Sequence, residues 1–182
     1  RNKIGWRLLP DFLSLGLSVC IMEIASAVVL ITFNLIILSL EGNMGVAAYG
    51  IVANLALVAT GVFNGLAQGA QPLASKHHGA HDHERANKIR QYTLATAFLL
   101  AISIYSGVTG YTDNIVAIFN SEGDIQVARM ASEGLRIYFL GFFFVGLNIV
   151  TATLFSATEN TKDAFLISIL RGFVLIIPLV IV

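Results

Sequence analysis

An acidic side chain stands alone in an apolar stretch near the start of the chain. Glu23 is the single charged residue between Phe12 and Leu40. A charge at the centre of a membrane helix costs roughly 2.5–3.5 kcal/mol. Such an acid is therefore either neutralised or kept for a functional role. Asn34 lies eleven residues further along and falls within about 20° of the same helix face. We expect Glu23, with Asn34 on the same inward face, to exchange a proton or to bind a cation or a substrate; the alternative is a protonated, structural glutamate.

Two other groups of polar residues have simpler explanations. Arg171 interrupts the last apolar stretch, where its long stem can extend to the membrane interface. The alternative for Arg171 is an ion pair with Glu23 or with an anionic substrate. All four histidines lie between His77 and His83, where a solvated turn is favoured over a zinc site. We therefore expect no metal site.

Small and polar residues recur at helical spacing in the second apolar stretch. Three glycines spaced four apart form two overlapping small-xxx-small repeats, which let another backbone approach closely. Amide side chains follow a neighbouring stripe, and a proline loosens the last turn. We expect these residues to line a cavity or to pack against another helix. They are Asn54, Gly61, Asn64, Gly65, Gln68, Gly69, Gln71 and Pro72.

The fourth apolar stretch is rich in phenylalanine and contains one asparagine. We add Asn148 to Glu23 and Asn34 as a residue that could bind the ion or the substrate. The aromatic rings between Phe139 and Phe144 are able to line a pocket for flat lipophilic cations. Contact with lipid or with neighbouring helices is the favoured interpretation of these rings.

The elements that must position these residues are membrane helices. Of the 182 residues, 56% are hydrophobic and 12% are charged, and the mean hydropathy is +0.78. Soluble domains carry about 25% charged residues, and a membrane-spanning helix needs about 20 mostly apolar residues. We predict an all-α polytopic membrane protein whose five transmembrane helices form one bundle. The predicted spans are 12–40, 46–75, 91–119, 132–157 and 164–182.

The charges are balanced in number but unevenly distributed. Eleven basic and eleven acidic residues give no net charge, so we expect no nucleic-acid partner. Basic residues concentrate in the N-terminal flank, in the 76–90 loop and at Lys162, whereas Arg129 is the one basic residue of the opposite loops. This asymmetry predicts a multi-pass protein of the cytoplasmic membrane, with its N-terminus in the cytoplasm and its C-terminus outside. The missing initial Met and the apolar end suggest truncation at both ends.

Two motifs resemble the multidrug and toxic compound extrusion (MATE) family of transporters. They are GVAAYGI at 45–51 and GLAQGAQP at 65–72, the latter followed by the Gly79-Ala80 turn. The resemblance covers the whole chain and implies helices seven to eleven of a twelve-helix transporter, most of its C-terminal six-helix bundle. Glu23 matches the acid that family members commonly carry on helix seven. Some members add an acid on helix ten, which this chain lacks, and Asn148 is its neutral counterpart.

The resemblance implies secondary active efflux of cationic or lipophilic drugs and toxic compounds. Antiport with H⁺ or Na⁺ would drive alternating access between two helical bundles, with no cofactor beyond the coupling ion. The implied partners are these small molecules, the lipid bilayer and a missing N-terminal half. The alternatives are a lipid-linked oligosaccharide flippase of the same superfamily and a non-transporting membrane scaffold. An enzyme is disfavoured because the spans hold no histidine and no pair of acids.

Overall fold

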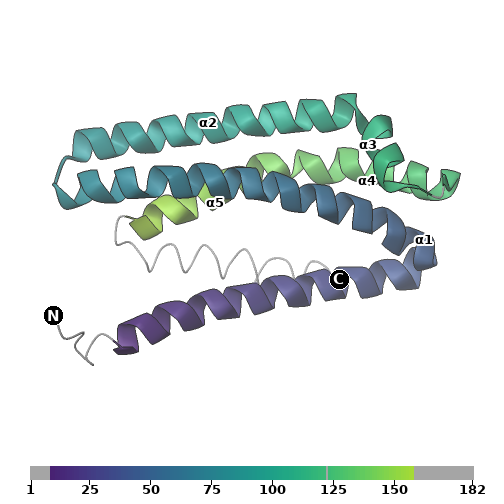
Figure 1. Ribbon diagram of the computed structural model, residues 1–182, viewed down its shortest axis with the longest axis horizontal. Coiled ribbons are helices and arrows are strands. Elements are labelled where there is room, and N and C mark those ends of the chain that lie inside the picture. The colour runs from purple at the N-terminus through teal and green to yellow at the C-terminus, as the bar shows by residue number, and fades with distance from the viewer. Residues whose placement is uncertain (1–8, 122, 158–182) are drawn as a thin grey trace.

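Helices form all of the regular structure in the described part of this protein. The computed structural model describes residues 9–121 and 123–157, with side chains described from Ile24 onward except at 25 and 26. Its helices are α1 (Leu9–Gly79), α2 (His83–Gly110), α3 (Thr112–Phe119), α4 (Ile125–Leu140) and α5 (Phe142–Ala157) (Figure 1). The all-α prediction is confirmed. The span expected at 164–182, with Arg171, lies outside the described residues.

Helix α1 consists of two legs, 9–41 and 43–79, joined by a sharp turn at Gly42. This residue has φ 64° and ψ −157°, a combination essentially restricted to glycine. Figure 1 shows the second leg running back in the direction from which the first leg came. The rings of Phe33 and Tyr49 stack across the turn at 6.2 Å. The spans expected at 12–40 and 46–75 lie in these two legs.

A second glycine lets the legs meet closely at this turn. A Cβ atom on Gly45 would lie 2.5 Å from Glu41 Cβ and 2.9 Å from Ile37 Cγ2. Such distances are well inside van der Waals contact, so only glycine fits. Gly42 and Gly45 therefore have different roles, because the first needs the backbone freedom and the second needs the missing side chain.

Replacing Gly42 by alanine should destabilise the protein through its backbone alone, since a Cβ atom there meets nothing within 4 Å. We expect Gly42→Ala to cost about 1–3 kcal/mol of stability, measured as thermal unfolding in detergent. Gly50→Ala is the matched control, because Gly50 is helical and equally open. It should be neutral or stabilising by up to about 1 kcal/mol. Equal effects of the two substitutions would contradict the strained turn.

The third expected span, 91–119, is not one continuous helix. Helix α2 begins earlier, at His83, and ends at Gly110, after which Tyr111 separates it from α3. The Tyr111 N–H donates to Gly107 O at 3.0 Å, and the buried Thr112 hydroxyl donates to Val108 O at 2.6 Å. The backbone break is thus satisfied by local hydrogen bonds. Hydropathy predicted the apolar stretch correctly but carried no information about this break.

The fourth expected span, 132–157, is also broken. Helix α4 begins at Ile125, and it meets α5 at Gly141 with a bend of 45°. The Gly141 N–H donates to Tyr138 O at 3.1 Å, three residues back, and so departs from the regular α-helical pattern. The rings of Phe139 and Phe142 stack across the bend at 4.6 Å. Ring stacking and redirected hydrogen bonds therefore stabilise the bend.

Among the described residues, two helices are long and apolar enough to cross a membrane. One is Ala27–Gly79, which includes the turn at Gly42, and the other is α2. The bent pair α4 and α5 supplies a third if the pair counts as one span. These lengths and compositions agree with a polytopic membrane protein.

The core is built largely from small side chains on facing helices. The second leg of α1 packs against α2, α4 and α5. Its buried face carries alanines about one or two turns apart, and α2 contributes Ala97 and Ala101. Small residues bring helix backbones together and so increase van der Waals contact, which drives helix association in membranes. The buried alanines of the second leg are Ala48, Ala56, Ala59, Ala67, Ala70 and Ala74.

One large side chain stands within this alanine face. Phe63 is fully buried, and a Cβ atom built on Gly146 of α5 would lie within 2.7 Å of three atoms of its ring. The ring of Phe63 also lies 6.4 Å from that of Phe142. At the end of the same two helices, the Ser75 hydroxyl donates to Ala157 O at 2.9 Å. The contact between α1 and α5 therefore combines packing of the Phe63 ring against Gly146 with the hydrogen bond from Ser75 to Ala157.

Adding a methyl group at Gly146 should overpack this contact. We expect Gly146→Ala to lower stability by about 1–3 kcal/mol, measured by thermal unfolding. Gly65→Ala is the control on the opposite face of α1, where a Cβ atom meets nothing within 4 Å. The double variant Gly146→Ala/Phe63→Leu should lose less stability than the sum of its single changes, because leucine frees space. Additive losses would argue against direct contact.

Candidate functional site

The small and polar residues singled out on the second leg of α1 form an exposed stripe opposite the alanine face. A Cβ atom on Gly61, Gly65 or Gly69 would meet nothing within 4 Å. Helix packing among the described residues uses the alanines, so whether the glycines line a cavity or pack against a further helix stays a prediction. We call this set the polar stripe. It comprises the exposed Asn54, Gly61, Asn64, Gly65, Gln68, Gly69 and Pro72, with the half-buried Gln71 beside them.

The side-chain amides of the polar stripe have unused hydrogen-bond donors and acceptors. Within the described part of the chain, Asn54, Asn64, Gln68 and Gln71 form no side-chain hydrogen bond. Each amide offers two N–H donors and a carbonyl acceptor. A polar group left unpaired in hydrocarbon costs several kcal/mol. The stripe is therefore suited to contact with water, a ligand or another protein segment rather than with lipid tails.

The three residues expected to bind the ion or the substrate lie on two helices. Glu23 lies in the first leg of α1, and its side chain is outside the described side chains. Asn34, on the same leg, is half-buried and donates from Nδ2 to Leu30 O at 3.0 Å. Asn148 is half-buried on α5. No hydrogen bond among the described residues joins Asn34 to Asn148, so their joint role stays a prediction.

The phenylalanines of α4 and α5 mostly contact neighbouring helices. Phe139 and Phe142 are buried, and Phe143 packs against Phe98 and Tyr105 with ring centroids 6.0 and 5.6 Å apart. Phe144 differs, being 73% exposed. The packing interpretation is thus confirmed for the first three rings.

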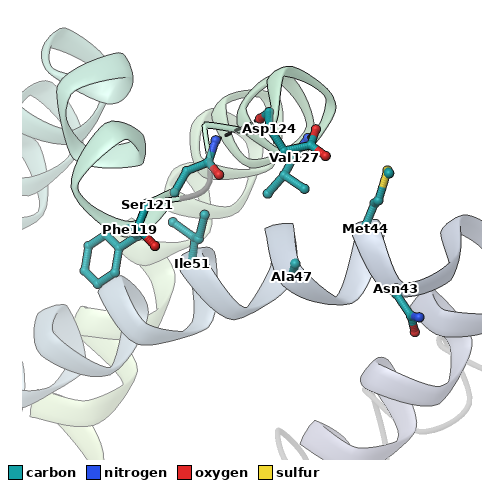
Figure 2. A pocket seen from close by; sticks show the side chains of 9 residues that line it. Asn43, Met44, Ala47, Ile51, Phe119, Ser121, Asp124 and Val127 are labelled. Carbon is teal, nitrogen blue, oxygen red and sulfur yellow. Dashed lines mark hydrogen bonds between the residues drawn. The ribbon is translucent and has the colours of Figure 1, made fainter.

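A pocket of about 450 Å³ opens at the end of the molecule where Gly42 lies. Figure 2 shows Met44, Ala47 and Ile51 of the second leg on the side that faces α4 and the turn before it, whereas Asn43 points away. Asp124 lines the pocket and caps α4, because its Oδ1 accepts from the backbone N–H groups of Gln126 and Val127. The sequence analysis gave no indication of this pocket, because its lining comes from segments far apart in the chain. Its lining residues are Asn43, Met44, Ala47, Ile51, Phe119, Asn120, Ser121, Asp124 and Val127.

A second, shallower pocket of about 440 Å³ lies between the Gly42 turn and α4. Arg129 Nε lies 3.2 Å from Glu133 Oε1 in an exposed ion pair at its rim. Its lining residues are Glu41, Gln126, Arg129, Met130, Glu133 and Gly134. Of the residues expected to bind an ion or a substrate, Asn34 and Asn148 have described side chains, and neither lines either pocket.

The histidine-rich turn joins α1 to α2 at the opposite end. His81 has φ 56°, and the N–H groups of His81 and Asp82 donate to His78 O and His77 O. This hydrogen-bond pattern is a Schellman motif with His81 in the left-handed position. Asp82 Oδ1 accepts from the Arg85 N–H and so caps α2. In the described residues, no three His, Cys, Asp or Glu side chains form a group that could hold a metal ion.

These features define a polytopic α-helical membrane protein with a polar stripe on an otherwise apolar helix. The chain belongs to the MatE family, whose family model matches residues 18–182. The expected resemblance to MATE transporters is thereby confirmed.

Similar proteins include multidrug exporters from two staphylococci. The multidrug export protein MepA of Staphylococcus aureus strain NCTC 8325 is 24% identical over 179 residues, which is 96% of this chain and 38% of that protein. MepA of Staphylococcus saprophyticus is also 24% identical, over 93% of this chain and 37% of its own length. The chain thus spans less than two fifths of the curated relatives that it matches.

Two solved structures share the fold with a TM-score of 0.84 each. One is an outward-facing multidrug resistance MATE family transporter of the MOP superfamily, with 14% identity. The other is a MATE protein in complex with MaL6, with 16% identity. Both matches cover 94% of this chain and 38% of the solved chain. At such identities the likeness shows the fold alone.

Cysteine labelling should distinguish the two faces of α1. In a Cys20→Ser background, Gln68→Cys should react quickly with a membrane-impermeant maleimide, because the polar stripe is exposed. The neighbouring Ala67→Cys is the matched control, since Ala67 is fully buried. The labelling rate of each thiol is measured in membranes. Equal protection of both thiols would mean that another segment packs on the stripe.

Proposed function

We propose that this chain is part of a secondary transporter that exports cationic or lipophilic small molecules across the cytoplasmic membrane. The polar stripe is the observation that carries the proposal, because α1 packs through its alanines and leaves its amide face exposed. The relatives named multidrug export protein support drug efflux rather than oligosaccharide flipping.

The polar stripe faces a central cavity shared with another part of the transporter. The chain corresponds to 38% of the length of its relatives, which leaves room for an N-terminal bundle. Transporters of this kind bind substrates near the membrane midplane, at the interface between repeats. Exposed amides and glycines at that interface give a surface that is polar, uncharged and shallow. Such a surface accommodates varied lipophilic cations as the two bundles alternate in access.

Glu23 is the residue that responds to the coupling ion, H⁺ or Na⁺. An intramembrane carboxylate is costly unless it is protonated or paired, so its state depends on whether the cavity is open to water. Asn34 and Asn148 supply neutral ligands, and Arg171 forms an ion pair with Glu23 in one of the states. A scaffold function, by contrast, would leave Glu23 replaceable by leucine.

The ends of the helices support the orientation that the loop charges predict. Lys76, Arg85, Lys88 and Arg90 gather at the turn between α1 and α2 or on the first turns of α2. The Gly42 end carries Asp113 and Asp124 near the break and the cap. Basic loops face the cytoplasm, so the Gly42 end faces outward.

The test of coupling is the substitution Glu23→Gln in the transporter that carries this chain. Glutamine keeps the size of the side chain but cannot ionise, so efflux of a fluorescent cation driven by a pH or Na⁺ gradient should be lost. Glu41→Gln is the control, because Glu41 is an exposed acid of the same helix at the Gly42 end. It should leave efflux unchanged. Normal gradient-dependent efflux in Glu23→Gln would exclude Glu23 from coupling.

A further inference from the structure

The turn between α1 and α2 carries an unusual density of titratable side chains. Residues 76–90, which we call the basic turn, contain four Lys or Arg residues, two acids and all four histidines. Its net charge is therefore +2 with neutral histidines and rises to +6 when all four are protonated. The transport proposal uses the Lys and Arg residues of this segment only to orient the protein in the membrane, and it makes no use of the histidines.

Ion pairs within the basic turn already use both of its acids. Asp82 Oδ2 lies 3.3 Å from Arg85 Nε and 3.6 Å from His77 Nδ1. Glu84 Oε1 lies 2.7 Å from Lys88 Nζ. Because both acids are already paired with the cations nearest to them, the other cationic groups of the basic turn are not neutralised.

The remaining cationic groups are open to the surroundings. Lys76 and Arg90 are exposed and form no ion pair within the described part of the chain. The imidazole ring of His83 lies 6.4 Å from that of His78 and 6.3 Å from that of His81. On the neighbouring helix, the Ala157 carbonyl of α5 accepts a hydrogen bond from Ser75 of α1. The described residues of α5 carry no charged side chain. Nothing acidic other than Asp82 and Glu84 faces the three rings from the described elements.

The position of the basic turn determines what these charges can meet. It joins two helices that are long and apolar enough to cross a membrane, so it lies at the level of the lipid headgroups. The Schellman motif and the Asp82 cap hold its backbone in one shape. Positive residues next to transmembrane helices attract anionic lipids, with about a fivefold gain in binding for each residue near the surface.

We propose that the basic turn binds the headgroups of anionic phospholipids and that this binding strengthens on mild acidification. Lys76 and Arg90 provide the attraction at neutral pH, and His78, His81 and His83 add charge as they gain protons. Histidine is the side chain whose charge ordinarily changes between about pH 5 and pH 8. His77 is not counted among these groups because its Nδ1 lies 3.6 Å from Asp82 Oδ2.

Electron paramagnetic resonance of spin-labelled lipids tests this proposal on the reconstituted protein. The protein is placed in phosphatidylcholine vesicles containing a trace of labelled phosphatidylglycerol or labelled phosphatidylcholine. The motionally restricted fraction of each label is measured at about pH 7.5 and about pH 5.5, on either side of the histidine transition. The unsubstituted protein should select phosphatidylglycerol at both values, and more strongly at the lower one.

Two substituted proteins separate the constant attraction from the pH-dependent one. The triple variant His78→Gln/His81→Asn/His83→Gln should keep the neutral-pH selectivity and lose its rise on acidification. Asparagine is used at position 81 because it tolerates the left-handed backbone of that residue. The variant Lys76→Gln/Arg90→Gln should lose several-fold in selectivity at neutral pH.

Matched controls make the outcome decisive. Arg129→Gln removes an exposed cation of α4 that is already paired with Glu133, away from the basic turn, and should change lipid selectivity much less than Lys76→Gln/Arg90→Gln does. An unchanged fraction of restricted phosphatidylcholine shows that each variant keeps its transmembrane surface. The proposal is overturned if the unsubstituted protein does not discriminate between the two lipids. It is also overturned if the triple variant retains the full rise at low pH.

Discussion

Close approach between α1 and α5 depends on the absence of a side chain at Gly146, beneath the buried ring of Phe63. Lipid tails are as apolar as leucine, so apolar burial contributes little to helix association in a bilayer. Van der Waals contact must supply the attraction, and it falls off steeply when surfaces separate. The ring on the glycine and the alanines along the same face maximise that contact. The bend at Gly141 brings Phe142 near the same ring, so two rings pack together at this crossing.

The use of the alanine face for packing determines what the other face of α1 can do. Alanine and glycine are both small, but only the glycine face also carries Asn54, Asn64 and Gln68. Lipid would leave these amides unpaired at a cost of several kcal/mol, whereas water or a polar partner satisfies them. The same helix therefore anchors the bundle on one side and offers a polar surface on the other. This division is the physical basis for placing the stripe toward a cavity.

Some of these features were predictable from the sequence, because they depend on local composition. Apolar stretches predicted where the helices lie. The breaks at Tyr111 and Gly141 were not predictable, because hydropathy averages over the redirected hydrogen bonds of a few residues. The spacing of the glycines shows a surface of small residues but does not say whether it lines a cavity or meets a helix, and the three-dimensional arrangement shows that the described helices meet the alanines. The joint placement of Glu23, Asn34 and Asn148 depends on tertiary contacts that spacing alone does not encode.

The turn at Gly42 connects this packed leg to the leg that carries Glu23. A helix is stiff, so a rotation at the turn displaces distant residues more than near ones. Glu23 lies nineteen residues from Gly42, about 28 Å along the helix at 1.5 Å per residue. Gly42 permits backbone angles closed to other residues, whereas the crowding at Gly45 limits how far the legs can close. The position of Glu23 relative to the polar stripe is therefore set by the geometry of this turn, far from the acid itself.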